Sequence, residues 1–248
     1  MRQATRWLAV GLLSLAAFFP GCGSGLTGGS IPPGGTRAEG IVVRGDAPGV
    51  VLPGAVIRFQ PISSSRAASN GGTNPPPPPT FPDNGGGNGG GGTTPLPVPE
   101  VPGTVKVTTT EQGTFAATSL PNGPLRVIVS PPADSGLLTI SYELDPGEGA
   151  DYYIVAAPLP AGFSTAGFTG LEVGPTNLDL RVGEAAQLEV RLVGAAPPAI
   201  VPSYLLKGGM GLINVHGRFT AVRPGRGVLR VLAGPYYADI NVVVREAR

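Results

Sequence analysis

Short runs of alternating apolar and polar residues recur along most of this sequence, and turns rich in glycine and proline separate them. Residues 54–62 read "GAVIRFQPI", and residues 186–194 read "AQLEVRLVG". A period of two residues is that of a β-strand with one buried face, because successive side chains point to opposite sides. After residue 21, no segment of useful length shows the period of an amphipathic helix. The pattern therefore predicts an all-β protein.

Glycine and proline interrupt the strand pattern most strongly in residues 63–103. The chain has 40 glycines and 29 prolines among 248 residues, which favours turns and short strands over helices. Residues 75–79 are five consecutive prolines, and residues 85–92 read "GGGNGGGG". Such sequence favours extended or flexible chain and has nothing to bury in a core. We therefore predict that residues 63–103 form a disordered insertion.

The amino-terminal segment has the layout of a secretory signal. Arg2 and Arg6 supply positive charge, an apolar run from Trp7 to Phe19 follows, and small residues come next. The run is too short to cross a bilayer, which takes about 20 residues. Cys22, the only cysteine of the chain, stands directly after this segment.

The residues Gly21-Cys22 after an apolar run resemble the lipobox of bacterial lipoproteins. The resemblance implies that the Cys22 thiol carries a diacylglycerol, that a peptidase cuts before Cys22, and that the protein is exported and anchored to a membrane of the bacterial envelope. The prediction is a signal peptide over residues 1–21 and a flexible tether over residues 22–36, which spans about 20 Å as a coil. The alternative is an ordinary secreted protein in which Cys22 is incidental.

The first block of strands resembles the carboxypeptidase regulatory-like domain, a small prealbumin-like β-sandwich without catalytic residues. The resemblance rests on four segments, which are residues 40–43 ("GIVV"), 54–57 ("GAVI"), 110–115 ("TEQGTF") and 120–127 ("LPNGPLRV"). We assign residues 37–160 to this domain, with the insertion 63–103 in one of its loops. Whether residues 132–170 complete the sandwich is left open.

The second block resembles a bacterial Ig-like domain of group 2. The matching residues are Pro175–Gly183, a hairpin at 215–221 ("VHGRFTA") and 224–228 ("PGRGV"). We assign residues 171–248 to this domain and residues 161–170 to a linker. The fold prediction is therefore two small β-sandwiches after a lipoprotein signal and a tether. Both families imply spacer or adhesive modules of the cell envelope.

The sequence contains few of the residues that catalytic sites commonly need. His216 is the only histidine and falls in the predicted hairpin turn, so neither a Ser-His-Asp triad nor a multi-histidine metal site is expected. We predict no catalytic residue, no cofactor and no metal.

A calcium site in the acidic region 134–151 is the weaker alternative to solvated turns. Arg44-Gly45-Asp46 is an RGD tripeptide, for which we favour a chance match. Tyr152-Tyr153 and Tyr236-Tyr237 are either sugar-stacking pairs or, as alternation favours, pairs with one core-facing member.

The charge balance argues against nucleic acid as a partner. The chain has 17 basic and 16 acidic residues, and removing residues 1–21 removes only Arg2 and Arg6, so the remainder is 15 − 16 = −1. No basic field is present to attract a polyanion. The sequence thus predicts a non-enzymatic lipoprotein with a structural, adhesive or spacer role, bound to the membrane through Cys22. The alternative is a glycan- or protein-binding accessory module of an envelope enzyme or transporter.

Overall fold

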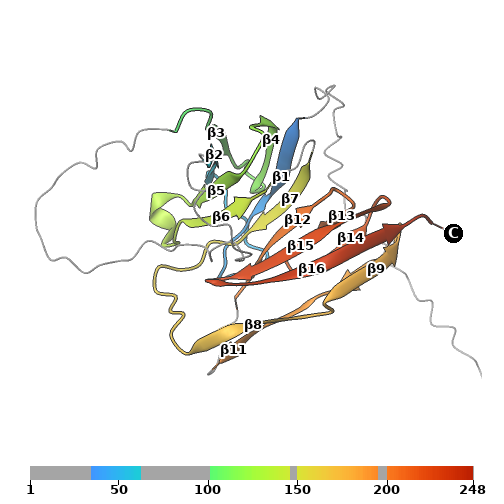
Figure 1. Ribbon diagram of the computed structural model, residues 1–248. Coiled ribbons are helices and arrows are strands. Elements are labelled where there is room, and N and C mark those ends of the chain that lie inside the picture. The colour runs from blue at the N-terminus through green and yellow to red at the C-terminus, as the bar shows by residue number, and fades with distance from the viewer. Residues whose placement is uncertain (1–34, 63–100, 146–149, 195–199, 248) are drawn as a thin grey trace, which may run out of the picture. The chain divides into compact units, whose positions relative to one another are not determined.

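The structure is a computed structural model that describes residues 35–62, 101–145, 150–194 and 200–247. Its regular elements are almost entirely β-strands, which confirms the predicted fold class (Figure 1). The strands are β1 (Thr36–Val42), β2 (Val56–Pro61), β3 (Val105–Thr108), β4 (Thr114–Leu120), β5 (Leu125–Ser130), β6 (Ile140–Leu144), β7 (Asp151–Ala156), β8 (Phe168–Gly174), β9 (Asn177–Arg181), β10 (Ala185–Gln187), β11 (Glu189–Gly194), β12 (Ser203–Lys207), β13 (Gly211–Ile213), β14 (Arg218–Ala221), β15 (Gly225–Ala233) and β16 (Tyr236–Arg245). A single 3₁₀ turn, η2 (Ala133–Ser135), precedes β6. Within the described ranges, no helix has the length and apolarity needed to cross a membrane.

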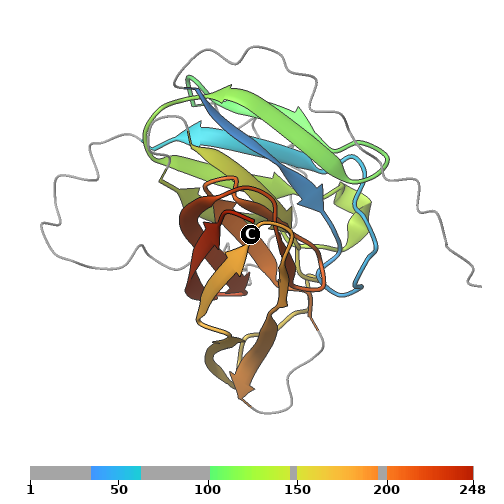
Figure 2. The ribbon, with the colours of Figure 1, turned by 90° about the vertical axis from the view of Figure 1, so that its right-hand side faces the viewer.

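Seven strands form one continuous sheet, which we call the central sheet. Its order is β4-β1-β7-β12-β15-β16-β9, so it draws strands from both of the predicted domains. The two halves meet at the antiparallel pair β7–β12, in which Ile154 lies opposite Leu205. Figure 2 shows the halves as the blue-to-green and the orange-to-red strands. The described residues accordingly belong to one compact unit of the chain.

Three smaller sheets cover the central sheet. The sheet β3-β2-β5-β6 packs on one face and encloses the first core, to which it contributes Ile57, Phe59 and Val127. The sheet β10-β14-β13 and the pair β8–β11 lie on the other face and enclose the second core, which includes Phe219. Two sandwiches therefore share the central sheet.

Strand β7 is the element that both cores share. Ile154 and Ala156 point into the first core, whereas Val155 between them points into the second. All three side chains are fully buried. A strand buried on both faces needs a continuous apolar run rather than alternation, and the segment "YYIVAAPL" at 152–159 has that composition.

The pair Tyr236-Tyr237 has one core-facing member, as expected, whereas both members of Tyr152-Tyr153 pack against a core. Tyr152 belongs to the first core, and Tyr153 packs against the second, because β7 has no solvent face. Tyr237 packs against the first core. Tyr236 donates a hydrogen bond to the carbonyl oxygen of Phe168 at 2.5 Å. No pair thus offers two free rings for stacking on a sugar.

The predicted hairpin in the second block is confirmed. β13 and β14 pair antiparallel, and the Gly217 amide donates to the Asn214 carbonyl oxygen at 3.0 Å to close the turn. Gly217 has a φ of 76°, which glycine adopts without strain. Tyr204 on β12 is almost fully buried and is the largest such side chain in the structure, filling the middle of the second core.

The element bounds differ in places from the ranges expected from sequence. β1 begins at Thr36, the last residue of the predicted tether, and β8 begins at Phe168, inside the predicted linker. Near the end of the predicted insertion, the Thr104 amide donates to the Val101 carbonyl oxygen in a turn; residues 63–100 lie outside the described residues. The question about residues 132–170 is answered, because β6 and β7 supply strands to both sheets of the first sandwich.

Candidate binding site at the distal end of the central sheet

The strand registers define two ends of the central sheet. At one end β1 begins at Thr36 and β16 finishes at Arg245, and the pairs Arg37–Asp151 and Gly225–Val244 lie there. We call this end the base. The opposite end, where the pairs Val42–Ala156 and Ala233–Tyr236 lie, is the distal end. A chain that enters β1 from the preceding residues therefore enters at the base.

An ion-pair cluster at the base joins the two halves. Asp151 accepts hydrogen bonds from Arg37 Nε at 2.7 Å and from Arg223 Nη2 at 2.8 Å. Arg37 belongs to β1, whereas Arg223 precedes β15 and also donates through Nε to the Gly209 carbonyl oxygen at 2.7 Å. The side chain of Asp151 is 23% exposed. The cluster therefore clamps the junction at the base.

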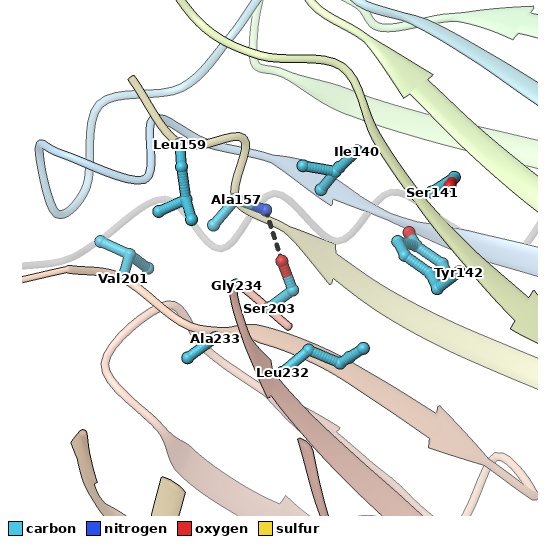
Figure 3. Close-up of a pocket in the computed structure, with 10 residues that line it drawn as sticks. All are labelled: Ile140, Ser141, Tyr142, Ala157, Leu159, Val201, Ser203, Leu232, Ala233 and Gly234. Carbon is cyan, nitrogen blue, oxygen red and sulfur yellow. Dashed lines mark hydrogen bonds between the residues drawn. The ribbon is translucent and has the colours of Figure 1, made fainter. Parts of the chain in front are cut away.

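A small apolar pocket opens at the distal end, between β6 and the ends of β7, β12 and β15. Its cavity volume is about 30 Å³. Ten residues line it, which are Ile140, Ser141, Tyr142, Ala157, Leu159, Val201, Ser203, Leu232, Ala233 and Gly234 (Figure 3). They come from both halves of the chain, so the pocket exists only because the two sandwiches share the central sheet.

Two hydroxyl groups interrupt the apolar lining. Ser203 is 6% exposed, and its Oγ accepts a hydrogen bond from the Ala157 amide at 2.9 Å. Tyr142 is also 6% exposed, and its hydroxyl has no hydrogen-bond partner among the described residues. Figure 3 shows this hydroxyl on the side of the ring nearer Ile140 and Ser203. A buried hydroxyl without a partner costs free energy. The Tyr142 oxygen exposes less than 1 Å² of surface, so it lies behind the pocket lining rather than open to an occupant.

Burial fixes the protonation state of this hydroxyl. Burial raises the pKa of Tyr142 far above its ordinary value, because the phenolate would lose its hydration. Tyr142 therefore stays a neutral donor at neutral pH. A cavity of this size has room for a water molecule or for one small group of a larger ligand. The lining is mostly apolar, so the pocket suits a small apolar group, and it supplies no nucleophile–base pair.

The arginine and the aspartate of the RGD tripeptide form an ion pair with each other. Arg44 donates from Nε and Nη2 to the two carboxylate oxygens of Asp46, at 2.9 Å each. This pairing lowers the pKa of Asp46. Gly45 is buried, and a side chain there would overlap the carbonyl oxygen of Pro158. Both charged groups of the motif are thus engaged with each other.

The acidic residues weighed for calcium are held apart. Glu143 pairs with Arg126 on β5, Asp151 pairs with two arginines at the base, and Asp134 lies in η2. Glu148 falls outside the described residues. In the part of the chain that the structure describes, no three His, Cys, Asp or Glu side chains gather in a group that could hold a metal ion.

The other predicted site residues lie in different places. His216 is exposed in the β13–β14 turn, and its carbonyl oxygen accepts a hydrogen bond from Gln187 Nε2 at 2.6 Å. Cys22, the predicted lipidation site, lies outside the described residues, as do the signal segment 1–21 and most of the tether. Sequence reasoning did not single out Tyr142 and Ser203. The only sequence feature that could have indicated Tyr142 is a tyrosine among the apolar positions of "LLTISYEL". The folded structure is needed to show that its hydroxyl is buried without a hydrogen-bond partner.

Comparisons with known proteins give only distant likeness. No family model matches the sequence, and no curated protein matches it. Among solved structures, the chain is similar to the Bacillus anthracis TIE protein, with a TM-score of 0.32 and 10% identity over 86% of this chain and 34% of that one. It is also similar to a Streptococcal ancillary pilin, with a TM-score of 0.30 and 15% identity over 86% of this chain and 62% of that one. The chain spans less than two thirds of the length of either structure.

Proposed function

We propose that the protein is a non-enzymatic lipoprotein of the bacterial cell envelope, anchored through a lipid on Cys22 and acting through its β-sandwiches in a structural or adhesive role. The observation that carries the proposal is the position of the base. β1 begins at the base, so a tether that ends there holds the base toward the membrane and leaves the distal end facing outward.

The chemistry of the described residues supports a binding or structural role over catalysis. The distal pocket is small and its lining is mostly apolar. The only histidine of the chain lies in a turn of the second sandwich. Lipid attachment suits such a role because each buried acyl CH₂ adds about 0.8 kcal/mol to membrane binding, so that two or more chains anchor firmly.

The anchor is tested by intact mass and membrane fractionation of the protein and of a Cys22→Ala variant, both expressed in a bacterial host. We expect the wild-type chain to begin at a diacylated Cys22 and to sediment with membranes, and the variant to lose both properties. Two soluble proteins with the same unmodified amino terminus would contradict the anchor and favour a secreted two-sandwich protein.

A second candidate function is recognition of a glycan or an envelope protein at the distal end. The specific observation in its favour is the apolar pocket of about 30 Å³ that residues of both halves line at this end. Glycan-array binding and cross-linking in cells would be compared between wild type and Ala233→Leu, which fills the pocket. Ala166→Leu, on the exposed loop before β8, is the matched control. The candidate fails if both variants bind like the wild type.

A further inference from the structure

The turn between β4 and β5, residues 121–124, reads "PNGP". It crosses at the base from the central sheet to the sheet β3-β2-β5-β6 of the first sandwich. Leu120 before it and Leu125 after it are both buried in the first core, whereas Asn122 is exposed. The turn is therefore a short solvent-exposed connection whose two ends are fixed by packing.

An asparagine that precedes a glycine can lose its side-chain amide in a reaction that consumes only water. The main-chain nitrogen of the glycine attacks the side-chain carbonyl carbon of the asparagine, a five-membered succinimide ring closes, and the side-chain nitrogen leaves as ammonia. Water then opens the ring at either carbonyl, which gives aspartate or isoaspartate. Glycine favours the ring closure because it has no Cβ to obstruct the attacking nitrogen and restricts the backbone least.

The structure leaves the reacting groups of Asn122 and Gly123 unhindered. In the part of the chain that it describes, the hydrogen bonds of asparagine side chains all belong to Asn177, Asn214 and Asn241. No main-chain hydrogen bond within the same ranges holds the Gly123 amide. A Cβ added at Gly123 would meet nothing within 4 Å, so the surroundings leave room for the ring.

The other described asparagines are held in place. Asn214 Oδ1 accepts hydrogen bonds from the amides of His216 at 3.0 Å and of Arg218 at 2.9 Å. Asn241 Nδ2 donates to Asn177 Oδ1 at 3.3 Å, and both residues lie on strands. Leucine or valine follows each of the three. Among the described asparagines, the one in the β4–β5 turn alone combines a following glycine with a side chain that no such bond restrains.

We propose that Asn122 deamidates spontaneously in the folded protein, so that the β4–β5 turn is a modification site. Gly123 supplies the attacking nitrogen, and water replaces the ammonia that leaves. Either product adds a carboxylate to the base, which is ionised at neutral pH. The inference does not depend on the lipid anchor, because the reaction uses only the folded turn and water.

The isoaspartate product changes the turn more than the aspartate product does. It routes the main chain through the side chain of residue 122, which lengthens the connection between Leu120 and Leu125 by one methylene carbon. Because both leucines are fixed in the first core, the longer connection strains the turn or displaces one of them. The ammonia is lost for good, so older molecules carry the modified turn more often than new ones.

The modification is tested by mass spectrometry of the full chain in a Cys22→Ala background, incubated at pH 8 in heavy-oxygen water. Trypsin releases Asn122 within residues 107–126, in which it is the only asparagine. We expect this peptide to exchange its NH₂ for a labelled OH at least about tenfold faster than the peptides with Asn214 or Asn241, a barrier lower by about 1.4 kcal/mol. Asn122→Gln should stay unmodified, because its cyclisation needs a six-membered ring.

Val215→Gly is the matched control, because it places a glycine after Asn214, whose side chain two amides hold. This variant should keep Asn214 intact while it is folded and lose the amide once urea unfolds it. Circular dichroism and the urea midpoint show that the variant is folded at the start. The proposal is overturned if Asn122 reacts only in unfolded chains, or if Asn214 of the folded variant reacts as fast as Asn122.

The strain in the turn is tested on the modified chains, which ion exchange separates through their added charge. The isoaspartate form should unfold at a lower urea concentration than Asn122→Asp, which adds the same charge without lengthening the main chain. Equal midpoints would contradict the strain that we expect from the longer connection.

Discussion

Asp151 and Arg223 form an ion pair across the junction of the two sandwiches, with Oδ2 and Nη2 2.8 Å apart. Asp151 opens β7 in the first half of the chain, and Arg223 lies between β14 and β15 in the second. Because Asp151 also binds Arg37, one carboxylate is shared by two guanidinium groups. The pair links the two halves at the base, so a substitution at Asp151 tests how much this contact contributes to stability.

Asp151→Asn should lower the free energy of unfolding by about 1–2 kcal/mol, since it keeps the shape of the side chain but removes one of the two acceptor oxygens and the negative charge that holds the two arginines together. Urea denaturation at unchanged m-value measures the effect. Glu172→Gln is the matched control: it breaks the exposed pair with Arg191 and should change stability by less than about 0.5 kcal/mol. An equal effect of the two substitutions would show that the junction does not depend on Asp151.

Stability should fall steeply at alkaline pH. Burial raises the pKa values of Tyr142, Tyr152, Tyr153 and Tyr204, so the unfolded chain loses these protons near pH 10 while the folded chain keeps them. The stabilisation is fully present below the unfolded pKa and is lost as the pH rises through and above it. Each group contributes a slope of about −1.4 kcal/mol per pH unit.

The measurement is the free energy of unfolding from pH 8 to pH 11. Tyr142→Phe should reduce the alkaline slope by about one quarter, because it removes one of the four tyrosines with a raised pKa. A slope that stays the same in the variant would mean that Tyr142 ionises while the protein is still folded. Tyrosinate absorbance recorded on the same samples would show this directly.

Ile154→Ala and Val155→Ala should both destabilise the whole described structure. The two residues are neighbours on β7, but their side chains fill opposite cores. We expect losses of about 2–5 kcal/mol for Ile154→Ala and about 2 kcal/mol for Val155→Ala. Amide NMR signals from the two halves should disappear in one common urea transition for each variant. Loss of signals from one half while the other remains folded would contradict the coupling of the two cores.

Gly40→Ala should cost about 3 kcal/mol or prevent folding, because rigid backbone surrounds the position. Gly40 lies on β1 opposite Ile154 of β7, and an added Cβ would overlap the Ile154 carbonyl oxygen. Gly170→Ala on β8 is the control, since nothing lies within 4 Å of its added Cβ. The midpoint of thermal unfolding compares the two. Similar midpoints would show that β1 and β7 can separate without cost.

The strands and their inward faces could be predicted from the sequence, whereas their assembly could not. Leu188 and Leu192 are buried and Glu189 and Arg191 are exposed, as period-two alternation requires. The shared sheet depends on the β7–β12 pair, whose strands are apolar on both faces. A run such as "YYIVAAPL" shows that a strand is buried on both sides but not which strand pairs with it.

The candidate pocket lay beyond sequence reasoning for a related reason. Tyr142 and Ser203 are 61 positions apart, and each reads locally as an ordinary strand residue. Their meeting depends on the pairing of the two halves, and the missing partner of the Tyr142 hydroxyl is a property of the packed interior. For Cys22 the situation is reversed. A sequence motif predicts its lipidation, and the residue lies outside the described residues.

The shared sheet limits how the two halves can recombine as separate gene segments during evolution. Modules that recombine freely during evolution usually end in loops, where few contacts cross the boundary. Here the boundary is a row of strand pairings from Tyr152–Lys207 to Val155–Tyr204. A gene fragment for either half alone would encode a protein with an uncovered apolar strand, prone to aggregate. Selection would therefore keep the two halves together as one unit of inheritance.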